Sequence, residues 1–170
     1  MRVLLSSLAA AAMLAGSTCQ VLADAQPCMR PAEKAAFDIA GLKSELMVVA
    51  IDCQAQSKFN AFVARFRPDL VNSENGLNAY FRRTAKGGVD RAHDDYITSL
   101  ANAQSDGAVA RGTLFCGERV GMFDTVLGLK DGNELRAYAS GQGIAQPISV
   151  TECPASPPAK KIKTASAKPE

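Results

Sequence analysis

The sequence predicts an all-α protein, a bundle of four to five helices stapled by two disulfides. Two observations carry this prediction. Residues 35–53 and 109–127 each place apolar side chains at alternating steps of four and three, which is the spacing of one face of an amphipathic helix. Each of these two faces carries a cysteine, Cys53 in the first and Cys116 in the second. The two faces are therefore expected to pack together and to be joined where they meet.

Residues 1–25 are predicted to be a cleaved signal peptide. Met1 and Arg2 supply a positive start, and residues 3–15 form an apolar run that is too short to span a bilayer. The sequence Ala23-Asp24-Ala25 is the preferred cleavage site, which leaves Gln26 as the first mature residue. We therefore expect a periplasmic or secreted protein without a transmembrane segment in the mature chain.

Cys19 offers an alternative, in which it becomes the lipid-modified first residue of a lipoprotein. Bacterial lipoproteins resemble one another in carrying Leu and then small residues before that cysteine. Here Gly16-Ser17-Thr18 precedes Cys19, with no Leu at the third position back. We favour cleavage near Ala25, which would discard Cys19.

The first half of the mature domain, which spans residues 26–153, is expected to hold three helices. Pro31 suits the first turn of a helix over residues 32–52. A second helix carries four apolar side chains and should end near Arg67, because Pro68 disfavours helical geometry in the residue before it. The polar segment 72–76 offers Asn72 or Ser73 as the N-cap of a short third helix. The apolar residues of the second and third helices are Phe59, Phe62, Val63, Phe66, Leu77, Tyr80 and Phe81.

Two further helices are expected after the break at Gly87-Gly88. Asp90 is predicted to cap the fourth, and Ser105 or Asp106 the fifth, which should run to about residue 129. The fifth contains four glycines, each of which weakens a helix interior. Either they allow close packing of another backbone or the helix breaks near Gly117; we favour close packing because the apolar period continues across them. The glycines are Gly112, Gly117, Gly121 and Gly128.

The C-terminal part is predicted to be less regular. Residues 134–152 alternate apolar and polar side chains in places, which favours a small β-like appendage, but their glycines and Pro147 equally suit an irregular segment that returns Cys153 to the body. Residues 154–170 form a Lys/Pro/Ala-rich tail that is expected to be disordered. The tail carries a charge of +3 while the whole chain carries +2, so the domain itself is near −1. The tail either holds the protein near an anionic surface or is a solubilising terminus.

The four cysteines of the mature chain are expected to form structural disulfides, because an exported protein folds in an oxidising compartment. A continuous helix over residues 32–52 would be about 30 Å long and would keep Cys28 far from Cys53. Two pairings remain, Cys53–Cys116 with Cys28–Cys153, or Cys28–Cys116 with Cys53–Cys153. We favour the first, which joins the two faces and ties the termini together. No C-x-x-C or paired zinc spacing occurs, so we expect no metal and no cofactor.

His93 is the single histidine and the one catalytic candidate. Its chemistry would suit a general base or a metal ligand. On a helix, however, Asp94 and Asp95 point away from it, so a partner would have to come from elsewhere, with Glu74 or Glu118 the carboxylates considered. We favour a structural role, in which the two aspartates stabilise a helix N-terminus. Common nucleophile, zinc-protease and phosphate-loop motifs are absent.

A basic-aromatic face is the predicted binding site. Residues 58–91 carry a net charge of +4 and interleave cations with aromatic rings. The contact residues are predicted to be Arg65, Arg67, Tyr80, Arg82, Arg83 and Lys86. Such a face suits an acidic protein or an anionic envelope surface, whereas nucleic acid is not expected as the partner of an exported protein. The alternative is a solvated helix surface.

These observations favour a non-catalytic interaction or envelope-associated module. A small hydrolase that uses His93 with distant carboxylates is one alternative. The other is a carrier of an apolar ligand between the helices, which requires the phenylalanines to line a cavity instead of filling it. Those phenylalanines are Phe59, Phe62, Phe66, Phe81, Phe115 and Phe123.

Overall fold

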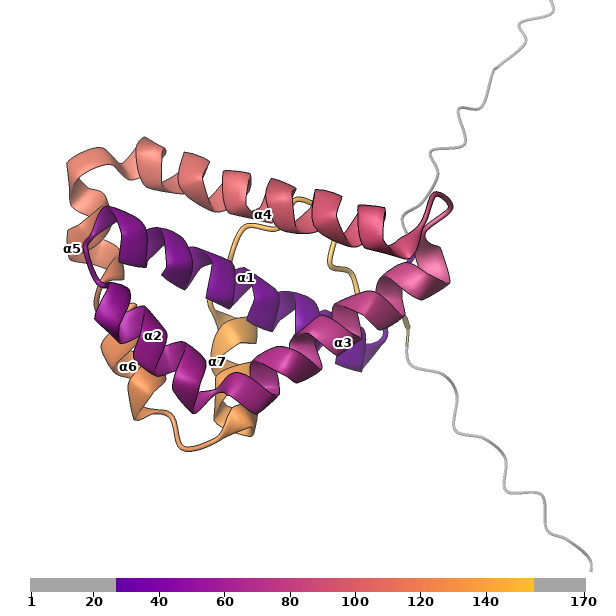
Figure 1. Cartoon of the computed structure of the whole chain (residues 1–170), viewed down its shortest axis with the longest axis horizontal. Coiled ribbons are helices and arrows are strands. Elements are labelled where there is room, and N and C mark those ends of the chain that lie inside the picture. The colour runs from indigo at the N-terminus through magenta and orange to yellow at the C-terminus, as the bar shows by residue number, and fades with distance from the viewer. Residues whose placement is uncertain (1–26, 155–170) are drawn as a thin grey trace, which may run out of the picture.

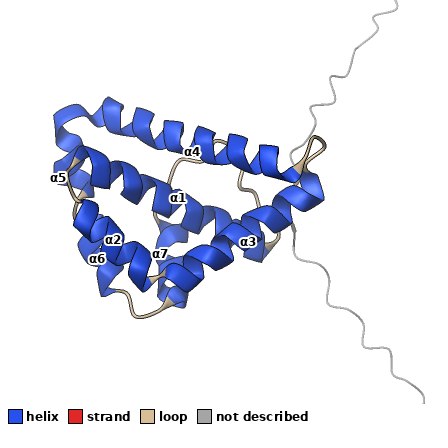
Figure 2. Cartoon of the chain, in the orientation of Figure 1, coloured by secondary structure: helices blue, strands red, loops and turns tan. Residues whose placement is uncertain are grey.

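The computed structural model describes residues 27–154, and over this range the protein is 77% helical and has no strand (Figures 1 and 2). The all-α prediction is confirmed, although the helices are more numerous and several are shorter than expected. In chain order they are α1 (Pro31–Asp52), α2 (Gln56–Arg65), α3 (Arg67–Thr84), α4 (Val89–Arg111), the 3-10 helix η1 (Gly112–Leu114), α5 (Phe115–Arg119), α6 (Met122–Gly128) and α7 (Gly132–Gly141).

The predicted signal peptide with its cleavage site near Ala25, the alternative at Cys19, and the tail beyond Pro154 lie outside the described residues. Among the helices of residues 27–154, none is both long and apolar enough to cross a membrane.

Helix α1 is the central element, in contact with α2, α3, α4, α5 and α7 (Figure 1). Pro31 occupies its first turn, where the Glu33 carboxylate accepts a hydrogen bond from the backbone N–H of Arg30 at 2.8 Å. The predicted apolar face is buried at Ile39, Leu42, Leu46 and Val49, and a second row is buried beside it at Ala36, Ala40, Ser44 and Val48. Because neighbours cover α1 on several sides, its burial extends well beyond one amphipathic stripe.

The predicted start of a third helix at Asn72 or Ser73 is wrong, since α3 begins at Arg67 and runs through both residues. Helix α2 ends at Arg65, close to the expected position, and Pro68 then occupies the first turn of α3. The polar and small residues of segment 72–76 lie where α3 crosses α1, and they contact α1 there. Ser73 Oγ donates to the Ala36 carbonyl at 2.7 Å, and a Cβ added to Gly76 would lie 2.5 Å from that of Ala36. Tertiary packing therefore explains residues that resemble a loop in sequence.

The predicted start of a fifth helix at Ser105 or Asp106 is also wrong. Helix α4 runs through both residues and begins after Gly88, whose φ of 110° suits glycine. It ends at Arg111, directly before Gly112, which has φ 53°. The expected single fifth helix is divided into η1, α5 and α6.

Close packing, the preferred explanation of the fifth-helix glycines, is not found. Apart from the neighbouring backbone of its own helix, a Cβ added to any of the four glycines would meet no atom within 4 Å. The chain instead breaks among these residues, at Gly112 and again at Val120-Gly121. The glycines thus mark breaks or open positions, as in the alternative that we considered for Gly117.

The β-like appendage is replaced by a helix and an irregular return segment. The Asp131 carboxylate caps α7 by accepting from the backbone N–H groups of Asn133 and Glu134 at 2.8 and 3.0 Å. Residues 142–154 then run back over α1, and a single parallel bridge pairs Met29 with Glu152. Apolar and polar residues alternate here over only a few positions, which is a weak signal for a strand. The Asp131 cap and the burial of Leu135 and Ala139 against the body favour a helix instead.

Two hydrophobic cores lie along α1. The large core contains seventeen buried residues, mostly from α1 and the short helices around it, with Leu70 of α3 and Ala108 of α4 also included. Four of its members are phenylalanines, Phe62, Phe66, Phe115 and Phe123. The small core contains eight: Met29, Phe37, Ala40, Leu77, Tyr80, Phe81, Tyr96 and Leu100. It is enclosed by α1, α3, α4 and the return segment, and half of its members are aromatic.

Both disulfides form in the pairing that the sequence favours. Cys53–Cys116 packs against the large core with a Cα–Cα distance of 5.5 Å. Cys28–Cys153 joins the two ends of the described chain, with a Cα–Cα distance of 4.8 Å. Helix α1 is continuous between Cys28 and Cys53, as the exclusion of that pair requires.

Candidate functional site

Helix α3 separates the predicted basic-aromatic residues into two groups. Arg65 and Arg67 lie where α2 meets α3, whereas Arg82, Arg83 and Lys86 lie at the other end of α3. At about 1.5 Å per residue, the groups are about 20 Å apart along the helix. The structure therefore does not bring the six residues together as one contact face.

Arg83 and Tyr80 both make contacts within the protein, although Arg83 is exposed at the surface and Tyr80 is buried. Arg83 Nε donates to Glu33 Oε1 at 3.2 Å and its Nη2 to Oε2 at 2.5 Å and to the Cys28 carbonyl at 2.9 Å. Its guanidinium lies 5.4 Å from the centre of the Tyr80 ring. Tyr80 is only 4% exposed, and its hydroxyl donates to the Pro27 carbonyl at 3.3 Å. These two residues fasten α3 to the start of the chain.

The Glu33–Arg83 pair is reflected in the pKa values of both groups. Burial alone would raise the pKa of Glu33, but hydrogen bonds from Arg83 and from the Arg30 backbone outweigh it and hold the pKa below its ordinary value. The hydrogen bond to Glu33 raises the pKa of Arg83. The pair is a structural link with both partners charged.

The other predicted cations are exposed. Arg65 stacks over Phe66 at 5.5 Å and donates to the Leu129 carbonyl at 2.5 Å. Arg67, Arg82 and Lys86 are exposed and make no ion pair or hydrogen bond with the rest of residues 27–154. These three are the predicted binding residues that remain available to a partner.

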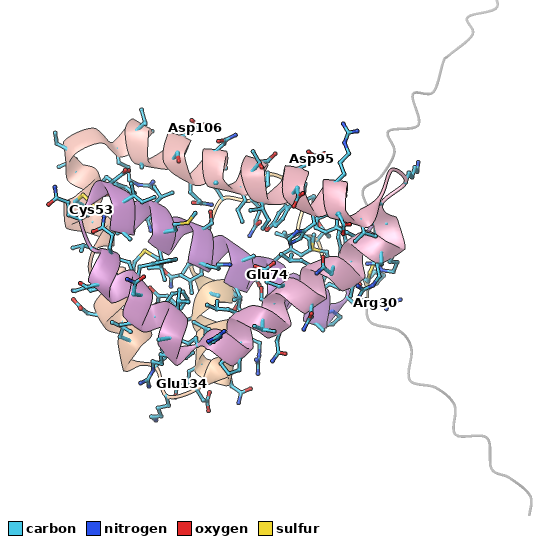
Figure 3. The ribbon with its side chains drawn as sticks, viewed as in Figure 1. Arg30, Cys53, Glu74, Asp95, Asp106 and Glu134 are labelled. Atoms are coloured by element: carbon cyan, nitrogen blue, oxygen red, sulfur yellow. A yellow bond between two sulfur atoms is a disulfide. The ribbon has the colours of Figure 1, made fainter. Side chains whose placement is uncertain are left out.

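His93 lies at the junction of three helices, in a chain of polar side chains. Its Nε2 is 3.1 Å from Glu74 Oε2 on α3, and Glu74 Oε1 accepts from Lys43 Nζ on α1, also at 3.1 Å. In Figure 3, Glu74 lies on the side of α3 that faces α1. Glu118, the other carboxylate considered, instead pairs with Arg111 at 3.5 Å. The structure thus identifies Glu74 as the partner of His93.

This arrangement is not a nucleophile and base pair. The second ring nitrogen, Nδ1, is 3.8 Å from the Asp94 carboxylate, and no described hydroxyl or thiol is hydrogen-bonded to it. The His93 ring also packs edge-on against Phe81. Within residues 27–154, no three His, Cys, Asp or Glu side chains are grouped so that they would hold a metal ion. The geometry supports a structural link between α1, α3 and α4.

A small pocket lies beside this polar chain, and we call it the α1–α3–α4 pocket. Its volume is about 190 Å³. It is lined by Ala40, Lys43, Ser44 and Met47 of α1, Glu74 of α3, and Ile97, Leu100 and Ala101 of α4. Ser44 is 8% exposed, and its Oγ is buried without a hydrogen-bond partner among the described residues. A polar atom brought into the pocket could supply the missing bond.

Lys43 and Ser44 are not among the residues predicted from the sequence. Ser44 continues the row of Ala36 and Ala40 at steps of four and interrupts it with a hydroxyl, which is the available signal. Nothing in the sequence paired Lys43 with Glu74, because that contact depends on how α3 crosses α1.

A wider groove of about 450 Å³ lies between the first half of α1, α3 and α7. Its rim carries the Asp69–Arg136 ion pair at 3.7 Å. None of the phenylalanines considered for an apolar carrier lines this groove or the α1–α3–α4 pocket. They pack in or against the two cores instead.

Comparison with known proteins gives no relative from which a function can be transferred: no family model, curated protein or solved structure matches the chain.

Proposed function

We propose that the protein is an exported, non-catalytic module that attaches to an anionic surface of the cell envelope. Its two disulfides are compatible with a periplasmic or secreted location, because such bonds persist in oxidising compartments. The observation that carries the proposal is the exposure of Arg82 and Lys86, without partners among the described residues, at the end of the molecule where the tail begins.

The last turn of α3 lies beside the exit of the chain. Arg83 donates to the Cys28 carbonyl, and Cys28 is bonded to Cys153, one residue before the end of the described chain. Both ends of the described chain leave the body near the α3–α4 turn in Figure 1. Because a chain spans at most about 3.5 Å per residue, Lys160 and Lys161 lie within about 25 Å of Pro154. The tail lysines can therefore reach the same surface as Arg82 and Lys86.

The charge on this end is mixed, so attachment depends on combining several cations. Asp90, Asp94 and Asp95 occupy the first turns of α4, where Arg91 offsets Asp95 at 3.7 Å. Each basic residue held close to an anionic membrane contributes about 1 kcal/mol, and salt screens that contribution. We expect the tail lysines to act together with Arg82 and Lys86. The position of Arg82 and Lys86 on the domain would then orient it on the anionic surface.

Vesicle co-sedimentation tests the proposal on the mature chain. Phosphatidylcholine vesicles with added phosphatidylglycerol should bind the protein at low salt, and pure phosphatidylcholine vesicles should not. Arg82→Gln with Lys86→Gln should weaken binding about thirtyfold at low salt, since two cations worth about 1 kcal/mol each are lost. Lys58→Gln with Lys130→Gln is the control, because it removes the same charge near α6 and α7.

Equal binding to both vesicle types, or an equal loss in the control, would contradict attachment through this end. His93→Ala should leave vesicle binding unchanged. If it abolished a measurable hydrolytic activity of the protein, the non-catalytic assignment would be wrong. Binding to an acidic protein without binding to anionic vesicles would also overturn the proposed partner.

A further inference from the structure

We propose that the α1–α3–α4 pocket binds a small monocarboxylate whose apolar body is about the size of a benzene ring. The proposal concerns a different part of the molecule from the cations at the α3–α4 turn and does not depend on attachment to an anionic surface. It rests on the size of the pocket, its buried hydroxyl and the charges at its rim.

The pocket has the size and walls of a site for a small apolar group. Its volume of about 190 Å³ is somewhat larger than the cavity of about 150 Å³ that holds benzene in other proteins. Leu100 and Ala101 line it from α4, and Ala40 lines it from α1. Met47 and Ile97, on opposite helices, are each 37% exposed. Apolar walls that stay partly open to solvent are typical of ligand sites.

Ser44 supplies a polar group that the fold itself does not use. Ser44 is one of the residues that line the pocket, and its Oγ is buried in the wall without a hydrogen-bond partner among residues 27–154. Buried hydroxyls are generally satisfied, so one that is left without a partner in a pocket wall points to a ligand atom. The hydroxyl can donate to a carboxylate oxygen.

The rim favours an anion over a cation. Lys43 uses one of its three N–H donors on Glu74, so donors remain for a second carboxylate. Both oxygens of Glu74 already face partners, Lys43 on one side and His93 on the other. A carboxylate bound beside Lys43 and Ser44 would gain a charge-assisted hydrogen bond, while its apolar body occupies the space against Leu100.

Titration of the mature protein with benzoate tests the site. Binding is measured by calorimetry and by the changes in backbone NMR chemical shifts. We expect saturable binding at one site, with shifts concentrated around Ser44 and Ala101, and weaker binding of benzyl alcohol. Lys43→Met should weaken benzoate about tenfold, since it removes one charge-assisted bond and keeps an apolar chain. Ala101→Phe should fill the pocket and abolish binding.

Ser44→Ala separates a ligand role from a structural one. It removes an unpartnered buried hydroxyl, so it should leave Tm unchanged or higher while it weakens benzoate binding several-fold. Ser99→Ala and Lys130→Met, at exposed positions outside the pocket, are the matched controls.

Three results would overturn the assignment: no saturable binding of benzoate, equal affinity for benzyl alcohol, or no effect of Ser44→Ala and Lys43→Met. A lipid acyl chain that co-purifies in the pocket and is not displaced by benzoate would identify a different ligand class.

Discussion

The large and small cores both pack against α1, but the elements that contribute most to each are different. Around the large core are mainly the short helices α2, α5, α6 and α7, the longest of which has ten residues, while α3 and α4 add one buried residue each, Leu70 and Ala108. The small core is enclosed by α3 and α4, of eighteen and twenty-three residues, and by the return segment. Isolated helices shorter than about 12–15 residues are marginal in water, so the large core depends more on tertiary contacts and on its disulfide.

The small core is instead held by ring contacts and by polar links at its edge. Phe37 is fully buried, with ring centres 4.8 Å from Tyr96 and 5.0 Å from Tyr80. The Tyr96 hydroxyl donates to the Gln146 side chain at 2.8 Å, and Gln146 in turn donates to the Phe37 carbonyl at 3.0 Å. Burial raises the pKa of Tyr96 far above its ordinary range, so this hydroxyl remains a donor. The small core thus combines aromatic ring contacts with hydrogen bonds that link α1, α4 and the return segment.

The largest expected effect is the loss of Phe37. Phe37→Ala should lower the free energy of unfolding by about 3–5 kcal/mol, because it leaves a cavity and removes the ring contacts. Phe123→Ala is the matched variant, since Phe123 is equally buried in the large core but has no ring contact with another described aromatic residue. Urea unfolding should show the greater loss for Phe37, by about 1 kcal/mol or more. Equal losses would mean that the rings contribute only through the area they bury.

Removal of a disulfide should have the next largest effect. Cys53→Ala with Cys116→Ala, or Cys28→Ala with Cys153→Ala, should each cost about 2–4 kcal/mol, because each bond closes a long loop in the unfolded chain. Hydrogen exchange should distinguish the two variants. Loss of Cys53–Cys116 should expose the amides of α5 and α6, whereas loss of Cys28–Cys153 should expose the bridge between Met29 and Glu152. Uniform exchange in both variants would contradict the contrast between the cores.

The sequence was sufficient for the parts of the fold that depend on local spacing. The period of four and three predicted the most regular part of the core, along α1, and the length of that helix excluded a bond between Cys28 and Cys53. Segments governed by tertiary contacts were not predictable in this way. Ser73 and Gly76 resemble a loop in sequence, yet they form the part of α3 that lies closest to α1.

The candidate site was less predictable than the fold. Arg83 lies at the surface as a cation is expected to, but its N–H donors are engaged by Glu33, fifty residues earlier in the chain. The unpartnered hydroxyl of Ser44 and the contact between Lys43 and Glu74 likewise require three helices to be placed. Residue type indicates what a side chain can do, whereas packing decides which side chains remain available.

The crossing of α1 and α3 lies between the two cores and can be tested with two glycines. Gly76→Ala should destabilise the protein by about 1–3 kcal/mol, because its Cβ would lie 2.5 Å from that of Ala36. Gly117→Ala places a methyl group in open space inside α5 and should stabilise it by about 0.5–1 kcal/mol. Thermal unfolding checks both variants. Opposite signs are expected, and a stabilising Gly76→Ala would show that the two helices can separate without loss.

The smallest expected effect is a pH dependence at the edge of the small core. The pKa of Glu33 is below its ordinary value of 4.5 in the folded protein, so the carboxylate stabilises the fold above that pH. This contribution is lost as the pH falls through the lowered folded pKa. Glu33→Gln should therefore cost about 1–2 kcal/mol at pH 7, and the difference from the wild type should shrink towards pH 3.

The wild type has to be compared with Glu33→Gln because the pKa of Asp131 is also lowered in the folded protein, so Asp131 also makes the protein less stable in acid. Hydrogen bonds from the Glu134 and Asn133 backbones lower the pKa of Asp131 at the start of α7, so its cap also weakens in acid. Urea unfolding of the wild type and of Glu33→Gln at both pH values cancels this shared loss. A difference that stays constant from pH 7 to pH 3 would mean that the charge of Glu33 contributes nothing, and that the side chain acts only as a neutral hydrogen-bond acceptor for Arg30 and Arg83.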